Sequence, residues 1–217
     1  MLGVKICGIT NMKDALLAAE AGANAVGFIL APSPRQVSCA TVEEIAKRLP
    51  PFVLRVGVIT PEADQGWMTL VVAGALDLIQ IHGDPQLPEW VPPARVIRAI
   101  PVQSGSELSA DWDLSKRRFR ALLLDTFKEG YYGGTGEAFD WRKAARYDKY
   151  NLPVILAGGL RADNVQTALD LAEPAGVDVG SAVESSPGRK DPVKVSRFIQ
   201  AVRSWEKKRR GNEDATG

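Results

Sequence analysis

The sequence predicts a single (β/α)8 barrel domain, and three observations support this fold class. Apolar strand candidates alternate with helical stretches along the whole chain, which is typical of a parallel sheet. Eight such strands fit within about 205 residues, the count expected of a compact barrel. No glycine-rich dinucleotide fingerprint follows the first strand, so a doubly wound sheet is the weaker alternative.

The expected strands are short apolar runs, each followed by glycine, proline or polar residues. In order, they are Val4 to Cys7, Ala25 to Leu30, Val53 to Ile59, Leu76 to Ile81, Arg95 to Ile100, Arg120 to Asp125, Leu152 to Ala157 and Val177 to Val179. Since parallel strands of a barrel all end at one face, the residues after them are expected to gather there.

Helix signals separate these strands. Asn11 is placed to cap the first helix, and Thr41 with Glu44 forms a capping box for the second. Further helices are expected at 61–74, 140–150, from 163 and at 192–205, with at best a short helix at 85–90 and a weakly patterned one within 103–116. The barrel domain is therefore assigned to residues 1–205, and the polar segment 206–217 is expected to be a disordered tail.

Composition excludes several classes of protein. Apolar residues make up 45% of the chain, charged residues 24%, and the net charge is +1. This balance gives no reason to expect a nucleic acid or an anionic membrane as a partner. No apolar run is long enough to span a bilayer and no leader precedes the first strand, so the sequence predicts a cytoplasmic protein. The two cysteines, Cys7 and Cys39, fit a reducing compartment better than a disulfide framework.

Two residues at the active face of the predicted barrel suggest acid–base chemistry. Cys7 ends the first strand and Asp125 ends the sixth, so they face each other across the mouth. To work near neutral pH, the pKa of the thiol has to fall and that of the carboxyl has to rise. A buried, inert cysteine and an aspartate that caps a loop are the alternatives for each residue taken alone.

Further polar residues fall at the same face. Arg35 follows the second strand in a proline-stiffened loop and suits a substrate carboxylate, although a surface arginine is the simpler reading of it alone. Gln80 and His82 follow the fourth strand, where the only histidine is a candidate base or a polar support. No second histidine or acidic triad accompanies it, so no metal site is expected.

Small-residue loops follow strands seven and eight, the usual place of a phosphate site in such barrels. They contain Gly158 and Gly159 in the first loop, and Ser181 and Ala182 in the second. Their backbone N–H groups and the Ser181 hydroxyl are suitable donors for phosphate oxygens. A phosphorylated small molecule is therefore the expected partner.

Strand alternation places Lys5 on the same face as Cys7, inside the barrel. A buried lysine needs an acidic partner, and Asp178 on the eighth strand is the candidate. We expect this pair to order the floor of the site and to favour the thiolate of Cys7. A long glycine-rich loop, 129–136, is expected to be either a lid or a disordered segment. Its glycines would allow it to close over a ligand at Asp125, and Gly134 is among the predicted substrate-binding residues.

These features together resemble the phosphoribosylanthranilate isomerase family of tryptophan biosynthesis. The matching segments, in family order, are residues 4–10, 27–28 with 33–35, 56–58, 80–83, 124–125, 133–136 with 139–141, 157–160, and 177–179 with 183–184. They cover almost the whole chain.

The resemblance implies an Amadori rearrangement of N-(5-phosphoribosyl)anthranilate to 1-(2-carboxyphenylamino)-1-deoxyribulose 5-phosphate without a cofactor. It implies that Asp125 is the general acid, Cys7 the general base, and Arg35 the residue that holds the anthranilate moiety. It also makes the two small-residue loops the phosphate cradle, and it leaves open whether the protein is a monomer or a homodimer.

This chain departs from the family pattern in the loop after strand eight, which reads Gly180-Ser181-Ala182 where Ser-Ser-Gly is usual. If the alanine position required a positive φ, the strain would be of order 1 kcal/mol. Two other readings compete with the isomerase. Indole-glycerol-phosphate synthase is disfavoured because no lysine ends a strand here, and a catalytically silent phosphosugar-binding barrel is disfavoured by the presence of both Cys7 and Asp125.

Overall fold

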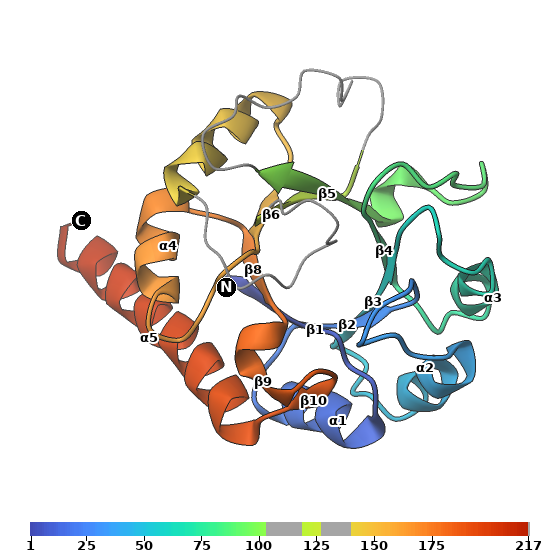
Figure 1. Cartoon of the computed structure of the whole chain (residues 1–217). Coiled ribbons are helices and arrows are strands. Elements are labelled where there is room, and N and C mark those ends of the chain that lie inside the picture. The colour runs from blue at the N-terminus through green and yellow to red at the C-terminus, as the bar shows by residue number, and fades with distance from the viewer. Residues whose placement is uncertain (103–118, 127–139, 217) are drawn as a thin grey trace.

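A computed structural model describes residues 1–102, 119–126 and 140–216 of the chain. Eight parallel strands form a closed barrel in sequence order, with β1 paired to β8, and helices surround it (Figure 1). The predicted (β/α)8 barrel is therefore confirmed. The barrel strands are β1 Gly3–Cys7, β2 Ala25–Ile29, β3 Leu54–Ile59, β4 Leu78–Ile81, β5 Val96–Val102, β6 Ala121–Thr126, β7 Val154–Leu156 and β8 Gly176–Val179.

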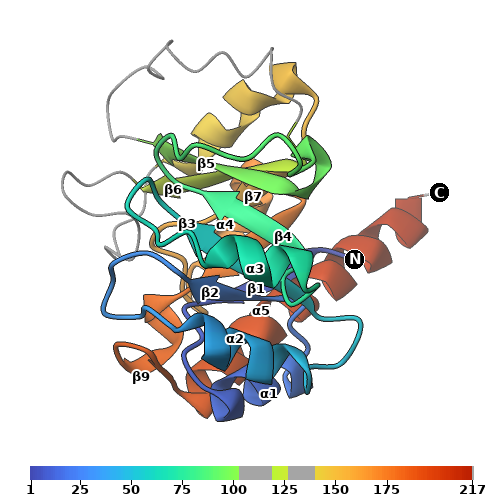
Figure 2. The same cartoon turned by 90° about the vertical axis from the view of Figure 1, so that its right-hand side faces the viewer.

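Helical elements follow the strands along the chain, and Figure 2 shows α1, α2 and α3 on the outer side of the strands. They are α1 Met12–Glu20, α2 Cys39–Ala46, α3 Trp67–Val72, the 3₁₀ helices η1 Pro93–Arg95, η2 Trp141–Tyr150 and η3 Ser181–Val183, and the helices α4 Val165–Ala172 and α5 Pro192–Thr216. None of the described helices combines the length and the hydropathy that a membrane span requires.

The core has two parts because successive strand residues point to opposite faces. Ala25, Val56 and Leu123 belong to a small cluster that fills the barrel interior. Val4 and Ile6 belong to the larger cluster between the strands and the helices. Lys5 and Cys7 alternate with them and therefore point into the barrel, as the period of two predicted.

The capping signals are confirmed for α1 and wrong for α2. Asn11 Oδ1 accepts from the Asp14 N–H at 2.9 Å and caps α1. In α2, however, Ser38 is the N-cap and its hydroxyl accepts from the Thr41 N–H at 3.2 Å. The helix begins at Cys39, two residues before Thr41, because Ser38 accepts from the Thr41 N–H. The predicted cap at Thr41 would instead have accepted from the N–H of Glu44, three residues later.

Other boundaries also differ from the prediction. The third helix is limited to α3, Trp67–Val72, and residues 85–90 form no helix, with η1 following them instead. The final helix α5 runs from Pro192 to Thr216 and so includes most of the segment 206–217 that was expected to be a tail. The helix predicted within 103–116 and the loop 129–136 lie outside the described residues.

One element was not predicted. After η3 the chain forms a two-stranded antiparallel hairpin of β9 Glu184–Ser186 and β10 Arg189–Lys190, with an irregular register between Arg189 and Lys190. Gly188 in the turn has a φ of +77°. The hairpin leads directly into α5. Lys190 Nζ donates to the carbonyls of Cys7 and Gly180, which follow the paired parts of β1 and β8, so the hairpin lies beside the mouth of the barrel.

Candidate active site

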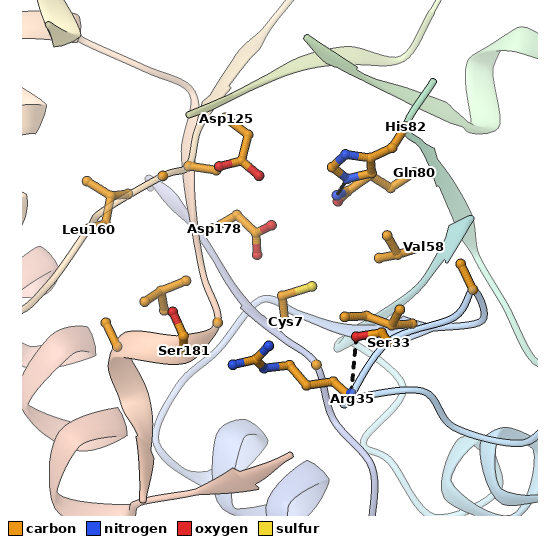
Figure 3. A pocket seen from close by; sticks show the side chains of 18 of the residues that line it. Cys7, Ser33, Arg35, Val58, Gln80, His82, Asp125, Leu160, Asp178 and Ser181 are labelled. Carbon is orange, nitrogen blue, oxygen red and sulfur yellow. Dashed lines mark hydrogen bonds between the residues drawn. The ribbon is translucent and has the colours of Figure 1, made fainter. Parts of the chain in front are cut away.

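A pocket at the carboxyl ends of the strands collects the predicted site residues. Its volume is about 580 Å³, within the range of small-molecule sites. Every predicted site residue except Gly134, which lies outside the described residues, lines this pocket: Cys7, Arg35, Gln80, His82, Asp125, Gly158, Gly159, Asp178, Ser181 and Ala182. Figure 3 shows Cys7 at its centre, Asp125 and Asp178 on one side and Gln80 and His82 on the other.

The Cys7 thiol is accommodated by a glycine on the neighbouring strand. Cys7 pairs in register with Gly27 of β2, and a Cβ on Gly27 would lie 2.8 Å from the sulfur and 3.0 Å from Lys5 Nζ. Any larger residue at Gly27 would therefore displace both groups.

Burial raises the pKa of the Cys7 thiol, whereas the positive charges of Lys5 and Lys190 act in the opposite direction. The predicted fall in the thiol pKa is therefore wrong for the unliganded site, because the removal of water outweighs the two nearby cations. Asp178 also opposes ionisation of the thiol. The resting sulfur is a thiol at neutral pH.

Asp125 shows the opposite situation, and here the prediction is confirmed. Burial and the negative charge of Asp178 raise the pKa of Asp125 to about 6, although the Thr126 N–H, which donates to its Oδ1 at 2.8 Å, and Lys5 favour the carboxylate. The group is thus a carboxylic acid over a much larger part of the pH range than an ordinary aspartate, as a general acid requires.

The predicted Lys5–Asp178 pair is present at the floor of the pocket. The two residues are neighbours in the β1–β8 register, and Lys5 Nζ donates to Asp178 Oδ2 at 2.8 Å. Both side chains are more than nine-tenths buried, with 5% and 7% exposed. Asp178 Oδ1 is buried and accepts no hydrogen bond from the described part of the protein. This oxygen is therefore an unused acceptor on a residue that lines the pocket.

Gln80 and His82 form a second polar pair on β4 and directly after it. Gln80 Nε2 and His82 Nε2 are 2.8 Å apart, and Gln80 Oε1 is buried without a hydrogen-bond partner among the described residues. Burial, followed by the charges of Lys5 and Arg98, lowers the pKa of His82 to about 4. The imidazole is therefore neutral at pH 7, and its low basicity makes it a poor candidate for the general base.

The small-residue loops after β7 and β8 lie together in the pocket wall. Gly158 and Gly159 have φ values of +76° and +64°, and a Cβ on Gly158 would lie 2.3 Å from Thr126 Oγ1. The Gly159 carbonyl accepts from Asn164 Nδ2 at 2.9 Å, which ties this loop to the start of α4. The loop conformation thus depends on glycine and is held from below by the helix cap.

Arg35 is anchored by a carboxylate that the sequence did not suggest as its partner. Its Nε and Nη2 donate to Glu184 at 2.8 to 3.0 Å. This pairing occupies one edge of the guanidinium and leaves the edge formed by Nη1 and Nη2 for a further partner. Burial favours the neutral form of Glu184, but hydrogen bonds from Arg35 and Lys190 outweigh it and lower the pKa of this carboxyl.

Comparison with known proteins places the chain in one family. The family model described as N-(5'-phosphoribosyl)anthranilate (PRA) isomerase matches residues 4–201. Isomerases of that name from Syntrophus aciditrophicus and Magnetococcus marinus are 42% and 44% identical to the chain, covering 99% and 92% of it and 93% and 94% of their own lengths. The chain belongs to this family.

Solved structures agree with this membership. Phosphoribosyl anthranilate isomerase from Thermotoga maritima has a TM-score of 0.78 and 38% identity, with 94% of this chain and all of that chain covered. A second isomerase structure, bound to reduced 1-(o-carboxyphenylamino)-1-deoxyribulose 5-phosphate, has a TM-score of 0.75 and 36% identity over the same shares. The chain is thus an isomerase with the barrel fold of its family.

The departure of this isomerase from the family pattern after β8 causes no backbone strain. Ala182 lies within η3, Ser181–Val183, and only Asn151 and Glu173 are non-glycine residues with positive φ in the described ranges. The strain that an alanine would suffer at a positive φ is therefore absent. Ser181 keeps its hydroxyl at the pocket wall.

Sequence reasoning missed three charged residues near the pocket. Arg161, in the loop after β7, lines the pocket. Glu184 and Lys190 form a buried ion pair, with 2.8 Å between Lys190 Nζ and Glu184 Oε1. In the sequence, Glu184 and Lys190 are two charged residues in a short segment between a barrel strand and a helix. Such a segment usually indicates a solvated loop, so the ion pair was not predicted. Within the described ranges no group of three or more histidine, cysteine or acidic residues is placed to hold a metal ion.

Proposed function

We propose that this isomerase converts N-(5'-phosphoribosyl)anthranilate to 1-(2-carboxyphenylamino)-1-deoxyribulose 5-phosphate in the described pocket, with Asp125 as the general acid and Cys7 as the general base. The observation that carries this proposal is the convergence of a buried carboxyl of raised pKa and a thiol on one pocket beside loops suited to phosphate. The ligand of the second structural relative is the reduced form of this product.

The first step is ring opening. Asp125 donates its proton to the furanose ring oxygen while the bond between that oxygen and C1′ breaks, and the anilino nitrogen supplies the electrons that form the C1′=N iminium. The proton of Asp125 remains on the new C4′ hydroxyl. A carboxyl with a pKa of about 6 is a suitable donor, because it is strong enough to transfer the proton and still partly protonated near neutral pH.

The second step is proton abstraction from carbon. Cys7, as thiolate, removes the proton from C2′, and the electrons of that C–H bond neutralise the iminium to give an enolamine. Loss of the C2′ hydroxyl proton and protonation of C1′ then give the ketone. The iminium makes the C2′ proton acidic only after ring opening, so the acid acts before the base.

In the resting site at neutral pH, the proton shared between the two catalytic groups lies mostly on Cys7, whereas the two reaction steps require it on Asp125. At pH 7 a carboxyl of pKa about 6 is about one-tenth protonated, and the thiol remains protonated because burial raises its pKa. The productive state has the same number of protons, with the proton on Asp125 and the negative charge on Cys7. A phosphorylated anionic substrate favours protonation of Asp125 by adding negative charge nearby.

The remaining pocket residues are assigned to binding. The outer edge of the Arg35 guanidinium is suited to the anthranilate carboxylate, and the loops with Gly158, Gly159, Ser181 and Ala182 to the phosphate. We assign ribose hydroxyls as donors to Asp178 Oδ1 and Gln80 Oε1, and the lack of a hydrogen-bond partner for either oxygen among the described residues supports this assignment. Each acceptor would then be satisfied only when the substrate is bound.

We place the enzyme in the cytoplasm, since both cysteines are free thiols. A related structure is described as monomers generated from the dimeric enzyme of Thermotoga maritima, so both forms occur among relatives. The phosphorylated substrate is the proposed small-molecule partner.

The proposal is tested by following turnover of freshly generated phosphoribosylanthranilate through its fluorescence in wild type, Cys7→Ser and Asp125→Asn. We expect both variants to lose at least about 100-fold in kcat and to retain binding of the reduced product. An unreactive wild type that still binds this analogue would identify a silent binding barrel. Full activity of Cys7→Ser would transfer the role of base to another group.

A further inference from the structure

We infer that Lys190 of β10 is a positioning residue of the isomerisation, whose ammonium group holds the end of β1, with Cys7, against the loop that follows β8. The inference rests on the proposed role of Cys7. The β9–β10 hairpin contributes no residue to the pocket lining. Lys190 therefore acts on the reaction indirectly, through the backbone that carries Cys7.

The geometry of the ammonium group is fully specified. Lys190 Nζ donates to the Cys7 carbonyl at 2.6 Å, to the Gly180 carbonyl at 3.2 Å and to Glu184 Oε1 at 2.8 Å. Three acceptors match the three hydrogens of a lysine ammonium. The side chain has 0% of its surface exposed, so water does not compete for these hydrogen bonds.

The two carbonyls lie where the barrel strands stop pairing. The β1–β8 register ends with the pair Ile6 and Val179, and Cys7 and Gly180 are the next residue on each side. Beyond this point the direct ladder no longer holds the two chains together. The ammonium group bridges them instead, so the backbone that carries the base and the loop that begins the predicted phosphate cradle share one donor.

The position of Lys190 is itself fixed from two directions. Its backbone N–H donates to Asp14 Oδ2 of α1 at 2.8 Å, and Asp14 is buried. Its side chain meets Glu184, which also accepts from Arg35 and from the Gly188 N–H at 3.3 Å. Displacement of Lys190 would therefore remove hydrogen bonds that hold Cys7, the loop after β8 and, through Glu184, Arg35 in place.

Charge adds a second effect of the same group. The positive charge of Lys190 favours the thiolate of Cys7 and opposes the rise in thiol pKa that burial causes. Replacing Lys190 with a neutral side chain is expected to move the titration of Cys7 to higher pH. A residue that served only to stabilise the hairpin would leave this titration unchanged.

The test compares Lys190→Met with Lys194→Met. Lys194 is a matched control because its Nζ donates to the Glu184 carbonyl at 2.7 Å, whereas the hydrogen bonds to the Cys7 and Gly180 carbonyls come from Lys190. We measure kcat and KM, and we follow the rate of iodoacetamide alkylation of the Cys7 peptide by mass spectrometry between pH 6 and 10. The alkylation readout does not depend on turnover, so a failure of the proposed isomerisation, seen with Cys7→Ser, is distinguished from a failure of this inference.

We expect Lys190→Met to lower kcat by at least about 10-fold, since small displacements of reacting groups have effects of this size, and to shift the Cys7 alkylation profile to higher pH. Lys194→Met is expected to leave both unchanged. Lys190→Gln, which keeps amide donors without the charge, is a second variant in case methionine prevents folding, and it is expected to show the same alkylation shift. Wild-type kcat and alkylation in either folded Lys190 variant would overturn the inference. So would failure of both to fold while Lys194→Met folds, because Lys190 would then be a purely structural residue.

Discussion

Replacing Asp125 with asparagine is expected to stabilise the folded protein at pH 7 while it removes the proposed acid. The reason lies in the pKa of the carboxyl, which burial and Asp178 raise from 3.8 to about 6 in the folded state. The unfolded chain carries an ordinary carboxyl, so the folded protein binds this proton more tightly. Stability is therefore lost as the pH rises from about 4 to about 6, and the loss is complete above both values.

The magnitude follows from the difference of about two pKa units, which corresponds to about 3 kcal/mol at 1.36 kcal/mol per unit. This is an upper value, because entry of water and reorganisation around the ion reduce it. Asparagine does not ionise, and its side-chain oxygen can still accept from the Thr126 N–H that now donates to Asp125 Oδ1. We therefore expect Asp125→Asn to increase the free energy of unfolding by about 1 to 3 kcal/mol at pH 7 and by much less at pH 4.

The assay is equilibrium urea unfolding of wild type and Asp125→Asn at several pH values between 4 and 8. Asp163→Asn serves as the control, since Asp163 is exposed and surface substitutions usually stay within about 0.5 kcal/mol. An asparagine variant that is less stable than wild type at pH 7, or a stability difference that does not depend on pH, would refute the reasoning.

Two further predictions concern the floor and the wall of the pocket. Lys5→Met leaves the Asp178 carboxylate buried without its cation and is expected to lower the free energy of unfolding by about 3 to 5 kcal/mol; a loss below about 1 kcal/mol in urea unfolding would contradict the importance of this pair. Gly158 has a φ of +76°, and an added Cβ would lie 2.3 Å from a threonine hydroxyl, so Gly158→Ala is expected to weaken binding of the reduced product at least 10-fold. Gly74 has a similar φ of +70° but open space around it. Gly74→Ala is therefore expected to cost about 1 kcal/mol of stability and to leave binding unchanged. Equal affinities of the two alanine variants in calorimetry would show that the Gly158 loop does not bind the ligand.

The features that the sequence revealed are those that follow from strand periodicity. Alternation along β1 placed Lys5 and Cys7 on one face, and closure of the barrel brought Asp178 beside Lys5, which the 2.8 Å contact confirms. Asp125 was found because it ends a strand, and strand ends share one face of a barrel. These inferences require only the alternation of residues along a strand and the assignment of a closed barrel.

The contacts that were not predicted join residues far apart in the sequence, and no hydrophobic periodicity indicates them. Lys190 meets the Cys7 carbonyl across 183 residues of sequence, and Glu184 meets Arg35 across 149; neither hairpin residue has a periodic signal. The direction of the Cys7 pKa shift was also missed, because residue types show which charges are present but not how much water remains around them. The cap of α2 at Ser38 was missed because two competing cap residues, Ser38 and Thr41, lie three residues apart.

The most direct test of the proposed acid–base pair is the isotope effect on turnover of substrate deuterated at C2′. In Cys7→Ser, removal of the C2′ proton becomes the slow step, so we predict that deuterium slows turnover clearly. In Asp125→Asn, ring opening becomes the slow step and precedes cleavage of the C2′–H bond, so we predict that deuterium has little effect. A large isotope effect in Asp125→Asn together with none in Cys7→Ser would contradict the assignment of the two roles.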